Sequence, residues 1–219
     1  MSKSPETVLR SQIITIALAM NAAAINRGKS GNVSARDSDG FLITPSGLPY
    51  EETKPADIVH VALDGNPAGA RAPSSEWRFH RDIYAARNDV NAIVHTHAPF
   101  ATTLACLDRG IPSFHYMVAV AGGKDIRCAA YATFGTQALS DHAVHALEGR
   151  KACLLAHHGM IAVGESLKTA LALAIEVETL AEMYWRALQI AEPALLSDEE
   201  MSRVLQKFET YGQQQSTAG

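Results

Sequence analysis

The chain has 219 residues, of which 47% are hydrophobic and 19% charged, so it is long enough for one domain with a substantial buried core. Its net charge of −4 argues against a nucleic-acid-binding surface, and no uninterrupted apolar run is long enough to predict a membrane span. The three cysteines form no CxxC pair and the N-terminus lacks the layout of a signal peptide, so we expect a cytoplasmic protein.

The predicted elements begin with a long helix over residues 4–28, in which Ser4 suits the N-cap, Pro5 the first turn and Gly28 the exit. Further along, the pattern predicts strands over 32–36, 41–44, 58–63, 92–95, 152–156 and 160–163, and strand-like pieces over 111–118 and 126–133. It predicts helices over 74–87, 136–148, 166–191 and 197–211, and one more that begins at residue 99. Strands in the middle with helices around them predict a three-layer α/β domain over residues 1–212, followed by a flexible tail over 213–219.

The sharpest local motif is His95-Thr96-His97 at the end of a predicted strand. Residues i and i+2 of a strand point to the same face, so both imidazoles can reach one ion. Neutral imidazoles suit zinc, and three protein ligands with one open position are typical of catalytic zinc sites. Taken alone, the motif is equally compatible with two structural histidines.

A second cluster, His157-His158-Gly159, interrupts an apolar strand. Burying two histidines at the end of a strand is unfavourable unless their ring nitrogens have a hydrogen-bond partner or a metal, although both could simply cap a strand at the surface. One of them is enough as a ligand, and Gly159 would let the backbone approach closely. Glu76 is a further candidate, because the N-terminus of a helix favours a carboxylate, although acidic residues are common there.

Three polar stretches could hold a phosphate: Gly31-Asn32, Ser46-Gly47 and Ser74-Ser75. A phosphate favours N–H and hydroxyl donors and a helix N-terminus, but each stretch alone is more commonly a cap or a turn. The chain has neither a GxxxxGK[ST] loop nor a GxGxxG fingerprint. Together these features predict a phosphorylated metabolite as the ligand and not ATP or NAD.

In this order along the chain, the segments resemble the class II, zinc-dependent aldolase family, which also includes ribulose-phosphate 4-epimerases and the adducin head domain. The resemblance covers nearly the whole chain and is strongest to the branch that cleaves L-fuculose 1-phosphate. It implies a three-layer α/β/α domain with a central, largely antiparallel sheet. The segments that carry it are residues 31–34, 43–47, 74–80, 95–97, 115–117, 131–136, 157–159 and 207–212.

The resemblance also implies roles for individual residues. The zinc ligands would be Glu76, His95, His97 and His158, with Glu76 also the general acid/base and Tyr116 a catalytic residue at the aldehyde end. The phosphate would be held by Gly31, Asn32, Ser46, Gly47, Ser74 and Ser75. Phe134, Phe208 and Tyr211 would close the pocket, the last two from a neighbouring subunit of a homotetramer. Lys29 would also lie at the pocket. It stands where a small hydroxyl residue is expected, and it could bind phosphate or crowd the substrate.

The implied reaction is cleavage of L-fuculose 1-phosphate to dihydroxyacetone phosphate and L-lactaldehyde, without a Schiff-base lysine. Family epimerases typically have Lys-Pro-Ser-Gly and Ser-Ser-Asp where this chain has Thr44-Pro45-Ser46-Gly47 and Ser74-Ser75-Glu76, and the longer acid favours the aldolase. Three alternatives stay open. They are another sugar-phosphate aldolase, epimerase, decarboxylase or dehydratase on the same scaffold, a non-catalytic module like the adducin head, and a zinc hydrolase.

Overall fold

A computed structural model describes residues 4–210 and contains one eight-stranded sheet in the order β4-β3-β2-β1-β5-β8-β7-β6. Neighbouring strands are antiparallel except β6 and β7, which run parallel, so the predicted largely antiparallel sheet is confirmed. The strands are β1 (Asn32–Arg36), β2 (Gly40–Ile43), β3 (Val59–Ala62), β4 (Pro67–Ala68), β5 (Ala92–Thr96), β6 (Arg127–Ala129), β7 (Ala152–Leu155) and β8 (Gly159–Gly164).

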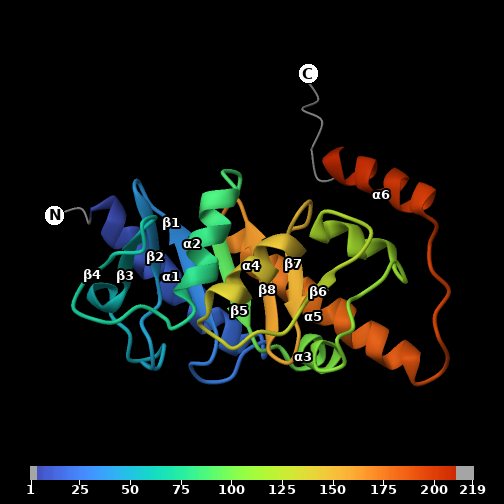
Figure 1. The fold of residues 1–219 in the computed structure, drawn as a ribbon, viewed down its shortest axis with the longest axis horizontal. Coiled ribbons are helices and arrows are strands. Elements are labelled where there is room, and N and C mark those ends of the chain that lie inside the picture. The colour runs from blue at the N-terminus through green and yellow to red at the C-terminus, as the bar shows by residue number, and fades with distance from the viewer. Residues whose placement is uncertain (1–3, 211–219) are drawn as a thin grey trace, which may run out of the picture.

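Helices cover both faces of this sheet (Figure 1). Helices α1, α3 and α5 pack on one face and α2 and α4 on the other, which confirms the predicted three layers. The helices are α1 (Pro5–Ala22), α2 (Trp77–Ala86), α3 (Pro99–Ala105), α4 (Gln137–Ala146), α5 (Leu167–Leu188) and α6 (Asp198–Thr210), with 3₁₀ turns η1 (Pro55–Asp57) and η2 (Tyr116–Ala121).

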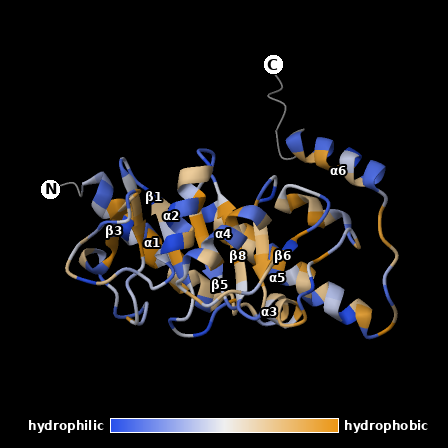
Figure 2. Cartoon of the chain, in the orientation of Figure 1, coloured by the Kyte–Doolittle hydropathy of each residue, from blue (hydrophilic) through white to orange (hydrophobic). Residues whose placement is uncertain are grey.

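The two apolar cores explain why β7 and β8 are hydrophobic at nearly every position and why β5 is apolar up to its last two residues. Val94 of β5 belongs to the core under α1, α3 and α5, whereas its neighbour Ile93 belongs to the core under α2 and α4. Successive side chains of a strand point to opposite faces, so a sheet covered on both sides needs apolar residues throughout. Figure 2 shows this as hydrophobic strands between helices with hydrophilic outer surfaces.

The structure corrects two of the predicted elements. The first helix ends at Ala22 and not at residue 28, because Ala24 adopts a left-handed φ of +58° and Gly28 lies in the loop beyond. The strand expected over 111–118 is reduced to one bridge between Ile111 and Ile126. Pro112 follows this bridge without a backbone N–H to continue a ladder, and the chain then turns into η2.

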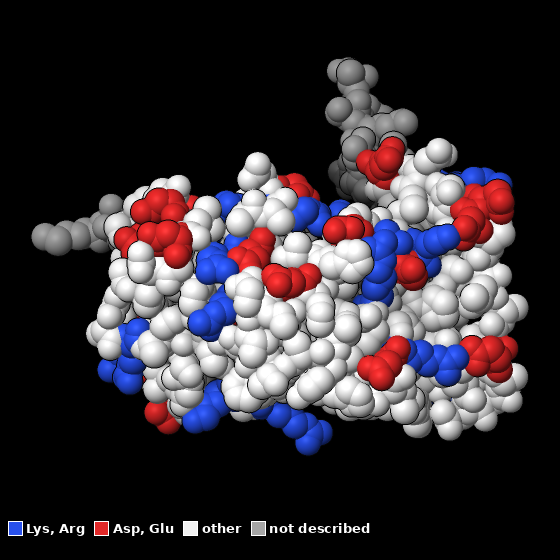
Figure 3. Space-filling model, in the orientation of Figure 1, with Lys and Arg blue, Asp and Glu red and all other residues white. Residues whose placement is uncertain are grey.

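Helix α6 lies apart from the sheet at the end of a long connection and packs against η2 (Figure 1). Within residues 4–210, no helix is both long and apolar enough to cross a bilayer. Acidic and basic side chains are interspersed on the face shown in Figure 3. Tyr211 and the predicted tail over 213–219 lie outside the described residues.

Candidate metal centre

The two histidine motifs meet because β5 and β8 are paired. Thr96 at the end of β5 is opposite Met160 near the start of β8, so the residues that flank these positions share one end of the strand pair. Glu76 reaches the same point as the N-cap residue of α2. The structure therefore gathers the four predicted metal ligands, with one donor atom from each lying within 4.8 Å of the others: Glu76, His95, His97 and His158.

Two glycines permit the close backbone packing around this cluster. A Cβ at Gly159 would lie 2.6 Å from the carbonyl oxygen of Thr96 and 2.9 Å from Cδ2 of His97. A Cβ at Gly31 would lie 2.6 Å from the carbonyl oxygen of His95. All three distances are shorter than van der Waals contact, so the expectation that Gly159 allows a close approach is confirmed.

The ring nitrogens of His95 and His97 face each other in this cluster. His95 is fully buried and donates from Nδ1 to the carbonyl oxygen of Met160 at 2.9 Å, so the lone pair of the neutral ring is on Nε2. This Nε2 lies 3.2 Å from Nε2 of His97. Burial and the neighbouring His95 and His158 lower the pKa of His97 to about 4, so its ring is neutral near pH 7. The lone pair on Nε2 of His95 is thus available to a bound cation.

The carboxylate of Glu76 completes this arrangement. Its Oε2 lies 3.0 Å from Nε2 of His95 and its Oε1 lies 3.1 Å from Nε2 of His158. Burial raises the pKa of Glu76, but the imidazoles of His95 and His158 lower it more, so the carboxyl is ionised. Its Oε1 is buried and makes no hydrogen bond with the described residues. One carboxylate oxygen and three imidazole nitrogens fit a divalent cation such as zinc.

A pocket of about 280 Å³ opens beside the cluster. The predicted Ser75 and Phe134 line it, whereas Ser30, Tyr131 and His157 were not predicted as lining residues. Tyr131 lies three residues before Phe134 in a motif already singled out, which was the available signal. His157 adopts a left-handed φ of +53°, packs edge-on against Tyr131 and lies 3.7 Å from Asp108. It therefore lines the pocket without joining the four-residue cluster.

The predicted phosphate stretches lie side by side next to Glu76. The N–H of Ser74 donates to the carbonyl oxygen of Thr44 at 3.1 Å, and the N–H of Ser46 donates to the carbonyl oxygen of Ala72 at 3.0 Å. Lys29 joins them, since its Nζ donates to the carbonyl oxygen of Gly47 at 2.7 Å. The exposed residues of this group are Lys29, Ser46, Gly47 and Ser75, whereas Gly31, Asn32 and Ser74 are buried.

Asn32 has other partners than the predicted phosphate. Its side chain is only 2% exposed and donates from Nδ2 to Oε2 of Glu76 at 3.1 Å. Its Oδ1 lies 2.5 Å from Nε2 of His80, a buried histidine that was not predicted as a site residue.

Tyr116 and Phe208 lie together, but in a different pocket from the metal cluster. They line a cavity of about 780 Å³ between η2 and α6. Tyr116 is 50% exposed, and neither aromatic ring lines the pocket beside Glu76 in the same chain. Within one chain of this structure, Tyr116 and the metal cluster therefore do not share a pocket.

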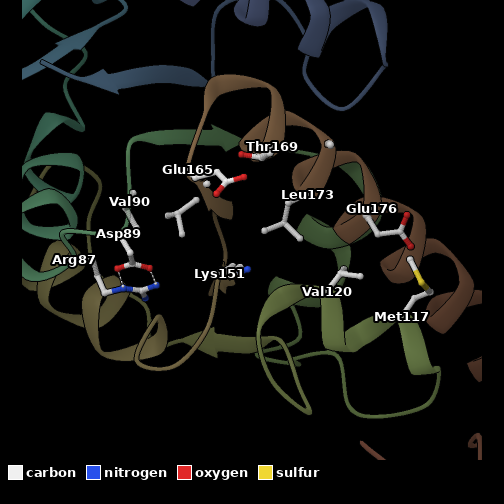
Figure 4. A pocket seen from close by; sticks show the side chains of 13 residues that line it. Arg87, Asp89, Val90, Met117, Val120, Lys151, Glu165, Thr169, Leu173 and Glu176 are labelled. Carbon is white, nitrogen blue, oxygen red and sulfur yellow. Dashed lines mark hydrogen bonds and ion pairs between the residues drawn. The ribbon is translucent and has the colours of Figure 1, made fainter. Parts of the chain in front are cut away.

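Another cavity, of about 530 Å³, lies at the opposite end of β5 and β8 from the histidines (Figure 4). The ion pair between Arg87 and Asp89, at 2.7 Å, forms one side of it, and Leu173 and Glu176 of α5 lie on the other. Its lining includes none of the four clustered residues.

A family model described as "Class II Aldolase and Adducin N-terminal domain" matches residues 11–185. The chain belongs to this family. It is 62% identical over 204 residues to the 5-methylthioribulose-1-phosphate/5-deoxyribulose-1-phosphate aldolase of Rhodospirillum rubrum, a match that covers 93% of this chain and 92% of that protein. It is 51% identical over 205 residues to the L-fuculose phosphate aldolase of Escherichia coli K12, covering 93% and 95%.

The fold is also that of solved family members. A structure titled "L-fuculose 1-phosphate aldolase" superposes with a TM-score of 0.90 at 42% identity and covers 95% of this chain and 98% of that one. The resemblance inferred from the sequence motifs is thus confirmed. The chain is a lyase of the aldolase type.

Proposed function

We propose that the chain is a zinc-dependent aldolase that cleaves a ketose 1-phosphate into dihydroxyacetone phosphate and an aldehyde. The convergence of Glu76, His95, His97 and His158 at one point supports this proposal most strongly. Zinc held by these residues would act as a Lewis acid toward the carbonyl and neighbouring hydroxyl oxygens of the ketose. Zinc itself is part of the proposal, because the same donor set also suits other divalent metals.

The chain's own residues would handle the protons of this reaction. The C3–C4 bond breaks, the C4 hydroxyl loses its proton to become the aldehyde, and C3 gains a proton. Glu76 has an ionised carboxyl at the metal cluster and an Oε1 without a hydrogen-bond partner, so it can first accept the proton that the C4 hydroxyl releases, directly or through Tyr116, and then deliver it to C3. Tyr116, supplied by a neighbouring subunit of a homotetramer, would supply and accept protons at the aldehyde end.

The phosphate would bind along the stretches next to Glu76. Ser46, Gly47 and Ser75 offer exposed hydroxyl or backbone groups there, and Lys29 adds a positive charge beside Gly47. The full proposed set also includes the backbones of Gly31 and Asn32 and the hydroxyl of Ser74. Phe134, Phe208 and Tyr211 would close the pocket, the last two across a subunit boundary of this cytoplasmic enzyme.

The substrate class that we propose is a ketose 1-phosphate without a hydroxyl group on its last carbon. L-fuculose 1-phosphate, 5-deoxyribulose 1-phosphate and 5-methylthioribulose 1-phosphate, the compounds named in the relatives' descriptions, share this feature. Tyr131, Ala132 and Phe134 give the pocket an apolar wall that suits a methyl or methylthio end. The 62% identical relative favours the five-carbon compounds, whereas the sequence motifs favour L-fuculose 1-phosphate.

The test is a comparison of 5-deoxyribulose 1-phosphate with ribulose 1-phosphate, which differ by one hydroxyl group, alongside L-fuculose 1-phosphate. We expect kcat/KM for release of dihydroxyacetone phosphate to be about ten- to a hundredfold higher for the deoxy compound. Chelator treatment should abolish the activity and added zinc should restore it. Equal use of both pentuloses would contradict the substrate class, and formation of an isomeric ketose phosphate in place of dihydroxyacetone phosphate would indicate an epimerase.

A further inference from the structure

Beneath the metal cluster, five buried polar side chains form one continuous hydrogen-bonded chain. The hydroxyls of Tyr84 and Ser34 are 2.8 Å apart, and Oγ of Ser34 is 2.7 Å from Nδ1 of His80. Nε2 of His80 is 2.5 Å from Oδ1 of Asn32, whose Nδ2 reaches Oε2 of Glu76 at 3.1 Å. No member of this buried chain is more than 5% exposed, so water does not compete for its hydrogen bonds.

The periodicities of one helix and one strand create this buried chain. Glu76, His80 and Tyr84 follow one another at intervals of four residues from the N-cap along α2, so they share a face of the helix. Asn32 and Ser34 are two residues apart on β1, so they share a face of the sheet. Each hydrogen bond of the buried chain therefore joins a residue of α2 or its N-cap to a residue of β1.

The donors in the buried chain can be assigned from the carboxylate outward. An ionised Glu76 only accepts, so Asn32 turns its NH₂ group toward it and its carbonyl oxygen toward His80. His80 must then donate from Nε2 and accept at Nδ1, which receives the hydroxyl proton of Ser34. The oxygen of Ser34 is left to accept from the hydroxyl of Tyr84.

The surroundings of His80 hold this one arrangement in place. Phe79 and Phe41 both stack on its ring, with centroid distances of 4.7 and 6.3 Å. Burial and the nearby His95 lower the pKa of His80 to about 3, so the ring is neutral and keeps one donor and one acceptor. A stacked ring whose two nitrogens are already paired with Ser34 and Asn32 fixes the direction of the Asn32 amide.

We propose that His80 is a positioning residue that acts through Asn32 to hold Oε2 of Glu76 in place. Its effect is to leave Oε1 as the oxygen that faces His158 and carries the proton. This inference rests on the proposed function of Glu76 as metal ligand and acid/base. It also gives the side chain of Asn32 a role different from phosphate binding, because this side chain would act on the rate of bond cleavage, whereas only the backbone of Asn32 belongs to the proposed phosphate site.

The principal test uses His80→Phe and His80→Gln in the full-length, zinc-loaded enzyme. Phenylalanine keeps the stacking but cannot donate to Asn32, whereas glutamine keeps an N–H donor. We expect His80→Phe to lower kcat about ten- to a hundredfold with KM changed less than about twofold, and His80→Gln to recover part of this loss. Ile83→Val is the matched control, because Ile83 is buried on the same helix but belongs to the apolar cluster.

A double-mutant cycle shows whether His80 acts through Glu76. In a Glu76→Gln background, His80→Phe should lower kcat no further, because the carboxylate that it positions is already gone. Asn32→Ala should lower kcat to a similar extent as His80→Phe, with little change in KM. An Asn32→Ala variant that raises KM but keeps kcat would overturn the proposal and return Asn32 to the phosphate site. An unchanged kcat in His80→Phe would overturn it as well.

Zinc affinity and two variants at the far end of the buried chain provide further tests of the role of His80. Zinc affinity, measured by competition with a chromogenic chelator, should fall about ten- to a hundredfold in His80→Phe but not in Ile83→Val. This readout does not require the substrate, so it separates a failure of the positioning proposal from a failure of the proposed reaction. If His80→Phe does not fold, Tyr84→Phe and Ser34→Ala interrupt the far end of the buried chain, and unchanged kcat and zinc affinity in both would overturn the proposal.

Discussion

Across the β5–β8 strand pair, Nδ1 of His95 donates to the carbonyl oxygen of Met160 at 2.9 Å. This hydrogen bond fixes the tautomer of the ring and directs the Nε2 lone pair toward His97 and Glu76. The register of the sheet thus sets the orientation of a metal ligand. A strand slip of one residue would turn His95 to the other face and dismantle the cluster.

The three clustered histidines should each be required for zinc. We expect purified wild-type protein to carry about one zinc per chain, since a single set of four ligands is present in residues 4–210. His95→Ala, His97→Ala and His158→Ala should each lose most of the zinc and the aldolase activity together. Elemental analysis of the purified variants, followed by the dihydroxyacetone phosphate assay, measures both.

His157 offers a matched control for these variants, because it precedes His158 and lies half-exposed near Asp108. His157→Asn should keep zinc, and asparagine tolerates the left-handed backbone that His157 adopts there. If His157→Asn loses zinc while His158→Asn retains it, the assignment of the ligand within this pair is reversed.

Removing the charge of Glu76 should separate metal binding from turnover. Glu76→Gln should keep zinc through the three histidines but lower kcat about a hundred- to ten-thousandfold, because an amide cannot carry the proton. Steady-state kinetics with zinc content measured on the same sample is the appropriate experiment. Glu165→Gln is the control, since Glu165 is an exposed carboxylate at the opposite end of β8. Near-normal turnover in Glu76→Gln would exclude Glu76 as the acid/base.

The two histidine motifs of the metal cluster were visible in the sequence, whereas the choice of His158 over His157 and the inclusion of Glu76 came from the family resemblance. His95 and His97 alternate along one strand, and His158 interrupts an apolar run, so their chemistry is visible without the fold. The partnership of Asn32 with Glu76 was not visible, because it depends on how β1 packs against α2. The four-residue spacing of Glu76 and His80 was an available signal, but a helical histidine on a buried face is usually read as part of the core.

The fold was predictable where periodicity is strong and less so where single residues decide. The long helix α5 and the hairpin of β1 and β2 lie close to their predicted positions. The end of α1 was wrong because an alanine, Ala24, takes a left-handed conformation that sequence reasoning reserves for glycine. Phe208 and Tyr116 share a pocket in one chain, and any contact of theirs with another subunit would be a quaternary property that no local pattern encodes.

Glu178 should stabilise the segment that follows the ligand strand. Its carboxylate accepts the N–H groups of Phe100 and Ala101, both at 2.8 Å, at the start of α3, a helix with no side-chain cap of its own. Glu178→Gln leaves one of these donors facing an NH₂ group, so we expect unfolding free energy to fall by about 1–3 kcal/mol. Urea denaturation measures the loss, with Glu182→Gln, which breaks a surface ion pair with Arg186, as a control of smaller effect.

The separation of Tyr116 from the metal cluster within one chain makes a complementation experiment possible. If a neighbouring subunit supplies Tyr116, then Glu76→Gln and Tyr116→Phe inactivate different halves of a shared site. Each variant alone should be impaired. Co-expressed chains should form mixed oligomers in which some sites combine an intact Glu76 with an intact Tyr116, and part of the activity should return.

The appropriate measurement is the specific activity of mixed oligomers isolated with two different affinity tags, so that homo-oligomers are excluded. The control is a pair of variants from the same half, Glu76→Gln with His158→Ala, which cannot produce an intact metal cluster in any combination and should stay inactive. If Glu76→Gln with Tyr116→Phe also stays inactive although mixed oligomers are isolated, the two residues act within one chain. In that case α6 and η2 would have to move toward the cluster during the reaction, because in this structure they line a separate cavity.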